Sequence, residues 1–171
     1  MTIHQHQSGV WPLLPAILSI LMITAAAPRA ADPPDSLQAI RAQLPKSVSL
    51  DNKVVYVDFW ASWCVPCRQS LPWMESLYRK YAAQGLEVVA VNVDKDHKAA
   101  MKFLENCRST FPIVYDSTGS LAKLYNLQTM PSSFIYDREG HLAESHRGFK
   151  MEEADNLERT IQQQLGERKA P

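Results

Sequence analysis

The sequence predicts an α/β domain in which a central mixed β-sheet carries helices on both faces. Two nearly continuous apolar segments, 53–60 and 86–94, have the composition of strands that are buried on both faces. An amphipathic segment separates them, so we expect two parallel strands joined by a right-handed crossover helix. Two further strands around the turn 137–140 predict an antiparallel hairpin, which makes the sheet mixed.

The N-terminal segment 1–30 predicts a signal peptide or a membrane anchor. Residues 10–27 carry no charge and run into small residues, which is the layout of a secretory signal. The same run is close to the shortest length that spans a bilayer, so a tether to the inner membrane is the alternative. We expect an exported, periplasmic protein, cleaved between Ala26 and Ala31. Thiols outside the cytosol are not kept reduced by default.

Residues 31–47 predict a linker rich in proline and alanine, followed by a short helix. Asp35 and Ser36 are the expected caps of this helix, and Pro45 is expected to stop it. The folded domain is expected over 48–166.

The rest of the domain alternates helices and strands. After the cysteines, apolar residues recur at steps of three and four, which predicts an amphipathic helix that ends near Gly85. A short tail follows the closing helix. The later elements are expected at 96–107 (helix), 111–116 (strand), 120–127 (helix), 132–148 (hairpin), 151–165 (helix) and 167–171 (tail).

The pair Cys64 and Cys67 allows three interpretations. As a staple it would stabilise little, because closing so short a loop restricts the unfolded chain by only about 2 kcal/mol. As half of a zinc site it would need two more ligands, and only Cys107, His141 and His146 are candidates. No metal is expected, because this spacing does not suggest a site. The third interpretation is a redox centre.

The surroundings of the pair favour redox chemistry. Cys64 stands where a strand ends and a helix begins, so free N–H groups and the helix dipole would stabilise its thiolate. Pro66 falls in the first helical turn, where a missing N–H costs nothing. Cys67 is expected deeper in the helix, which suits a resolving thiol.

Asp58 is the only charged residue between Val54 and Trp60, in a strand that is otherwise apolar. A buried carboxyl at this position would have a raised pKa and could exchange a proton with Cys67. The alternative is an edge position where Asp58 meets water.

The segments "VDFWASWCVPCRQSLP" and "TMPSSFIYDREGHL" resemble the active-site and cis-proline segments of the thioredoxin fold. The resemblance spans most of 48–165 and includes Trp63, Pro72 and Pro131. It implies that Pro131 is cis and that the backbone of Met130 seats a substrate strand.

Residues 95–125 insert a helix and a strand between the βαβ unit and the C-terminal ββα unit. This insertion, the export segment and the Val-Pro dipeptide are similar to the TlpA/ResA-like family of exported thiol-disulfide oxidoreductases. The resemblance implies that Cys64 is the nucleophile, Cys67 the resolving thiol and Asp58 the proton relay. The substrate-binding residues that it implies, together with their neighbours, are Trp63, Pro66, Thr129, Met130 and Pro131.

The expected function is reduction of disulfides in extracytoplasmic partner proteins by a monomer without a bound cofactor, recharged by a membrane thiol donor. A disulfide oxidase or isomerase is the main alternative, and a copper-binding chaperone is a further one. The chain has 18 basic and 18 acidic residues and no basic stripe, so no nucleic-acid partner is expected. Cys107 is expected to be a small buried hydrophobic residue, with a regulatory disulfide as the alternative.

Overall fold

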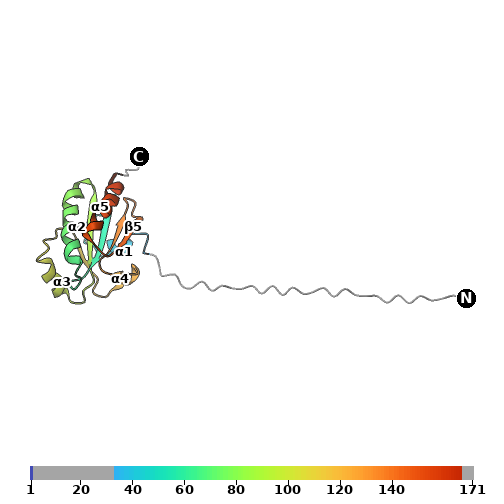
Figure 1. Ribbon diagram of the computed structural model, residues 1–171, viewed down its shortest axis with the longest axis horizontal. Helices are drawn as coiled ribbons and strands as arrows, with labels where there is room; N and C mark the ends of the chain where they lie inside the picture. Colours follow the sequence, from blue (N-terminus) through green and yellow to red (C-terminus); the bar gives the residue numbers. More distant parts are fainter. Residues whose placement is uncertain (2–32, 167–171) are drawn as a thin grey trace.

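The computed structural model describes Met1 and residues 33–166, and it shows a central sheet between layers of helices (Figure 1). The predicted signal or anchor at 2–30 and the tail at 167–171 lie outside the described residues. The strands are β1 (Val54–Trp60), β2 (Leu86–Asn92), β3 (Ile113–Tyr115), β4 (Ser132–Tyr136) and β5 (Leu142–Arg147). The helices are α1 (Gln38–Arg41), α2 (Cys67–Tyr81), α3 (His97–Leu104), α4 (Ser120–Leu124) and α5 (Met151–Gly166), with a 3₁₀ turn at Ala82–Gln84.

The strand order is β3-β2-β1-β4-β5, which confirms the predicted mixed sheet. Strand β2 pairs in parallel with β1 and β3, whereas β4 pairs antiparallel to β1 and β5. Both central strands, β1 and β2, are buried along their whole length, as their continuous apolar runs predict. The parallel strands leave their carboxyl ends at one edge of the sheet, and the cysteine pair follows β1 at this edge.

Two apolar clusters cover the two faces of the sheet. One contains alternate β1 residues such as Tyr56 and Trp60 together with the buried sides of α2, α3 and α5. The other contains the intervening β1 residues, such as Phe59, with buried residues of α1 and α4. Because side chains alternate across a strand, each β1 residue faces the cluster that its position dictates.

Helix α2 follows the predicted amphipathic pattern and buries Leu71, Met74 and Leu77 against the sheet. It ends at Tyr81, and a 3₁₀ turn leads to Gly85 at φ 100°, a left-handed conformation that favours glycine. Pro72 lies inside the helix. The other helices are also found at their predicted places, although α3 and α4 are shorter than predicted.

The predicted caps of the first helix are wrong. Helix α1 begins at Gln38, the residue before it is Leu37, and no side chain caps its N-terminus. The Asp35 carboxylate instead accepts a hydrogen bond of 2.9 Å from the backbone N–H of Leu142, at the start of the edge strand β5. Leu37 and Ile40 are buried in the second cluster, so α1 is part of the domain's core.

Within residues 33–166, none of the helices combines the length and the apolar character needed to cross a membrane.

Candidate active site

A disulfide joins Cys64 and Cys67 at the N-terminus of α2. The backbone N–H of Cys67 points at the Cys64 sulfur, at 3.3 Å from nitrogen to sulfur. This contact is the one expected for a sulfur that faces the free N–H groups of a helix start. In the reduced protein it would stabilise a thiolate on Cys64, because an N–H donor and the positive end of the helix both favour negative charge.

A groove runs past the disulfide. One side is the segment 63–66, and the other is the segment 127–130, which leads into β4; together they enclose about 570 Å³. Cys64 lines this groove but is only 3% exposed, while Cys67 is fully buried behind it. Trp63 is 66% exposed and stands beside the disulfide. A partner that reaches the disulfide along this groove therefore meets Cys64 and not Cys67.

The predicted substrate seat forms the far side of the groove. Thr129 and Met130 line it, and the peptide bond between Met130 and Pro131 is cis. Pro131 itself is buried behind the groove, where its carbonyl accepts a hydrogen bond of 2.8 Å from the N–H of Gly148. The Ser132 hydroxyl donates to the Thr129 carbonyl at 2.9 Å, which holds the turn in place.

Asp58 is 1% exposed, and its Oδ2 atom has no hydrogen-bond partner among the described residues. Burial raises the pKa of this carboxyl well above its usual range. The alternative of an edge position is wrong, because β1 lies between β2 and β4. By the alternation of the strand, Asp58 shares the face of Tyr56 and Trp60, which is the face that α2 covers. The acid therefore lies beneath the helix that carries Cys67.

The structure adds a polar network that the sequence analysis missed. Asp94, which follows β2, accepts hydrogen bonds from the Ser62 backbone N–H at 2.8 Å and from the Ser62 hydroxyl at 3.0 Å. The Asn92 side chain donates to the same carboxylate at 2.9 Å. Asp94 thus ties the loop before the cysteine pair to the end of β2. Its position after a buried parallel strand is the signal that could have found it, since such strand ends gather functional groups at one edge.

The remaining candidates have other surroundings. Within residues 33–166, no three side chains of the metal-binding types stand together as a group that could hold an ion. Cys107 is free and partly buried against the first cluster, near the end of α3. Trp60 packs against Phe103, and Trp73 packs against Phe149, so both belong to the core and not to the groove.

A mixed five-stranded sheet between helices, with a Cys-x-x-Cys disulfide at a helix N-terminus beside a cis-proline turn, defines a thioredoxin-like fold. Comparison with known families assigns the chain further. Residues 29–161 match the Redoxin family, and the chain belongs to this family.

Several curated relatives are thiol-disulfide oxidoreductases by name. ResA of Geobacillus kaustophilus (strain HTA426) is 36% identical over 110 residues, which cover 64% of this chain and 62% of ResA. ResA of Bacillus thuringiensis subsp. konkukian (strain 97-27) is 33% identical over 101 residues, which cover 59% of this chain and 58% of ResA. The match therefore spans about three fifths of the length of these relatives, 58% and 62%.

Solved structures agree with the fold. A protein described provisionally as the thiol:disulfide interchange protein DsbE of Chlorobium tepidum superposes with a TM-score of 0.67 and 45% identity. That match covers 68% of this chain and 83% of the other. StoA from Bacillus subtilis superposes with a TM-score of 0.56 and 30% identity, over 64% of this chain and 83% of StoA.

Proposed function

We propose that this protein is a thiol-disulfide oxidoreductase that reduces disulfides in partner proteins outside the cytoplasm. The observation that carries the proposal is the Cys64–Cys67 disulfide, which lies at a helix N-terminus with only Cys64 facing the groove. The names of the ResA, DsbE and StoA relatives and the export-like segment 1–30 support it. The protein acts as a monomer, either soluble in the periplasm or tethered by residues 10–27.

The cycle begins with reduced cysteines. The Cys64 thiolate attacks one sulfur of a partner disulfide that lies in the groove against Met130. The partner's sulfur–sulfur bond breaks, a new bond joins Cys64 to one partner sulfur, and the other sulfur leaves as a thiolate. The N–H of Cys67 favours the attacking form of Cys64, because it donates to the sulfur.

Cys67 completes the reduction. It is fully buried, so its proton needs an internal acceptor, and Asp58 lies under the same helix. Once it is ionised, a carboxyl with a raised pKa accepts the proton of a thiol more readily than an ordinary aspartate does. The Cys67 thiolate then attacks the Cys64 sulfur of the mixed disulfide, and the partner leaves with both of its sulfurs reduced.

The protein ends the cycle with the Cys64–Cys67 disulfide and must be reduced again by a dithiol donor, which we place in the membrane. Every step is an exchange between a thiol and a disulfide, so the cycle needs no bound cofactor.

A cysteine variant tests the mechanism. In Cys67→Ser the mixed disulfide with the partner cannot be resolved, so a covalent complex that dithiothreitol releases is expected to accumulate on Cys64. The double variant Cys64→Ser with Cys67→Ser should form no complex. Both proteins also carry Cys107→Ser, so that a complex cannot form through the third cysteine. If no complex forms while Cys64 still reacts with iodoacetamide, the two-step mechanism is wrong.

The equilibrium potential of the pair tests the direction of electron flow. A reductase is expected near the value of thioredoxin, about −270 mV, whereas a strong oxidant lies near −120 mV. Titration in dithiothreitol or glutathione buffers, followed by alkylation and mass measurement, separates the two. A value near −120 mV would replace the reductase by the disulfide oxidase.

A further inference from the structure

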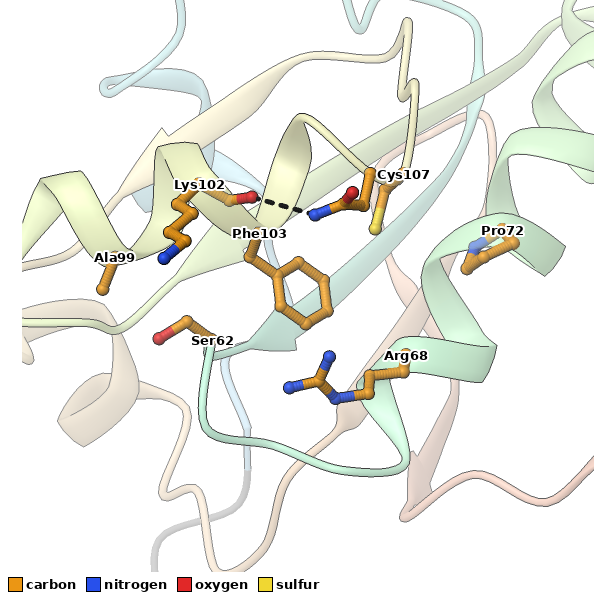
Figure 2. A pocket seen from close by; sticks show the side chains of 8 residues that line it. Ser62, Arg68, Pro72, Ala99, Lys102, Phe103 and Cys107 are labelled. Carbon is orange, nitrogen blue, oxygen red and sulfur yellow. Dashed lines mark hydrogen bonds between the residues drawn. The ribbon is translucent and has the colours of Figure 1, made fainter.

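A second hollow lies beside the cysteine pair, between the segment 62–72 and helix α3. It encloses about 460 Å³ and shares no lining residue with the substrate groove. Its apolar walls come from Pro72, Ala99, Phe103 and Cys107, and its cations are Arg68 and Lys102 (Figure 2). We call it the α3 pocket.

The α3 pocket presents unpaired positive charge. The Arg68 guanidinium lies over the Phe103 ring, 5.4 Å from the ring centre. Arg68 and Lys102 are exposed, and among the described residues neither of them forms an ion pair. Other exposed cations, Arg41, Arg79 and Lys80, are each paired with a carboxylate. The Asn106 side chain at the pocket is directed to the backbone, donating to the Lys102 carbonyl at 3.3 Å.

The charge of the surrounding segment has the same sign. Residues 95–108 contain four lysines and arginines but two acidic residues, Asp96 and Glu105. The Asp96 side chain accepts the N–H of Lys98 at the N-terminus of α3, so it is committed to capping the helix. An apolar hollow with cations at its rim is complementary to a ligand that joins an apolar group to a carboxylate.

The position of the α3 pocket links it to the redox centre. Ser62 precedes Cys64 by two residues and Arg68 follows Cys67, and both line the pocket. Two exposed apolar side chains, Trp63 at 66% and Val65 at 72% exposure, line the groove and belong to the same segment, 62–68, that supplies Ser62 and Arg68 to the pocket. A polypeptide whose disulfide lies in the groove can therefore extend over these side chains into the α3 pocket.

We propose that the α3 pocket selects partner proteins that carry an acidic residue next to an apolar one close to the disulfide. The apolar side chain packs on Phe103, and the carboxylate lies between Arg68 and Lys102. This inference rests on the proposed function, because it names the substrate class of the same redox centre. A partner with basic residues beside its disulfide is disfavoured, because these residues repel Arg68 and Lys102.

Three synthetic peptides test the proposal. Each carries the same disulfide loop and the same leucine, and they differ only in whether glutamate, glutamine or lysine stands beside the leucine. Reduced protein is expected to reduce the glutamate peptide about tenfold faster in kcat/KM than the glutamine peptide, since two surface cations contribute. The lysine peptide is expected to be slowest, and added salt should narrow all differences.

Variants of α3 locate the effect. Lys102→Glu is expected to abolish or reverse the ratio of kcat/KM between the glutamate peptide and the glutamine peptide; Lys102→Gln is the milder form. Lys98→Glu is the matched control, because Lys98 is exposed on the same helix but does not line the pocket. Equal effects of Lys98→Glu and Lys102→Glu would overturn the proposal and leave only a general charge effect. Arg68 is left intact, since it adjoins Cys67.

A binding measurement separates this proposal from the proposed function. The chain has 3 cysteines, and Cys64 and Cys67 are joined in the oxidised protein, so Cys107 is its one free thiol. The glutamate peptide with serines in place of its cysteines is expected to slow alkylation of Cys107 by iodoacetamide severalfold, but not in Lys102→Glu. Unchanged alkylation overturns the pocket even if all peptides are reduced. Protection without any reduction supports the pocket and overturns the oxidoreductase.

Discussion

Replacing Asp58 by asparagine is expected to stabilise the protein by an amount that grows with pH. The carboxyl is fully buried without a partner for Oδ2, and burial raises its pKa well above the ordinary value of 3.8. The folded protein therefore holds this proton more tightly than the unfolded chain does. Such a group costs no stability below the unfolded pKa, and the cost grows as the pH rises towards the folded pKa.

The upper limit of this cost follows from the unfolded pKa alone. Each pH unit above 3.8 removes about 1.4 kcal/mol of stability until the folded carboxyl ionises. At about pH 7 the cost is therefore at most about 4 kcal/mol. Asparagine has nearly the same shape and no charge, so Asp58→Asn does not have this pH-dependent cost. Any other difference in the free energy of unfolding between the two proteins is independent of pH.

Urea denaturation of the two oxidised proteins between about pH 4 and pH 8 measures the difference in the free energy of unfolding. The advantage of Asp58→Asn should increase with pH, by at most about 1.4 kcal/mol for each pH unit, and level off once the folded carboxyl ionises. Asp155→Asn, at an exposed position on α5, is the control and should change stability by less than about 0.5 kcal/mol. If the difference in the free energy of unfolding does not vary with pH, the pKa of Asp58 is not raised in the folded protein and the reasoning is wrong.

The same substitution separates stability from activity. If Asp58 accepts the proton of Cys67, the more stable Asp58→Asn should release its partner more slowly from the mixed disulfide. A reduction of about 100-fold is expected for the loss of a general base. Stopped-flow tryptophan fluorescence on a model disulfide would follow this step. An unchanged rate would remove Asp58 from the mechanism while leaving its effect on stability intact.

Two further substitutions test the framework of the site. Asp94→Ala removes the two hydrogen bonds from Ser62 and the one from Asn92. Urea denaturation is expected to show a loss of about 3 kcal/mol in the free energy of unfolding, and proteolysis should cut the loop around Trp63 more readily. A loss below about 1 kcal/mol would show that water replaces the carboxylate. Arg138 donates to three backbone carbonyls from separate segments, all within 3.1 Å, so Arg138→Ala should cost about 2 kcal/mol by the same assay. Arg138→Lys should recover less than half, because an ammonium group lacks the planar fork, and full recovery would contradict this reading of the contacts.

Local patterns were sufficient for most of the fold. The apolar runs of β1 and β2 are buried on both faces, as their composition predicts, and the alternation of strand and helix predicts the parallel pair. The hairpin of β4 and β5 follows from the turn residues between them. The caps of α1 were not predictable in this way. Asp35 has a capping side chain, but an edge strand supplies a competing N–H that is distant in sequence.

The sequence by itself determined the redox centre, because every feature of it is local. The pair Cys64 and Cys67, the strand before it and the helix after it occupy one continuous segment. The apolar strand around Asp58 predicts its burial, although only the place of β1 between β2 and β4 excludes an edge position. Backbone periodicity is enough to deduce such features, since neighbours along the chain are neighbours in space.

Only the tertiary structure decided what surrounds that centre. The groove needs the segment 127–130 to meet 63–66, the Asp94–Ser62 contact spans 32 positions, and the α3 pocket needs Lys102 and Phe103 beside Arg68. These contacts join segments that are remote in sequence. Their geometry depends on how the helices pack on the sheet and on which way each side chain points, and neither follows from a residue's own neighbours in the chain.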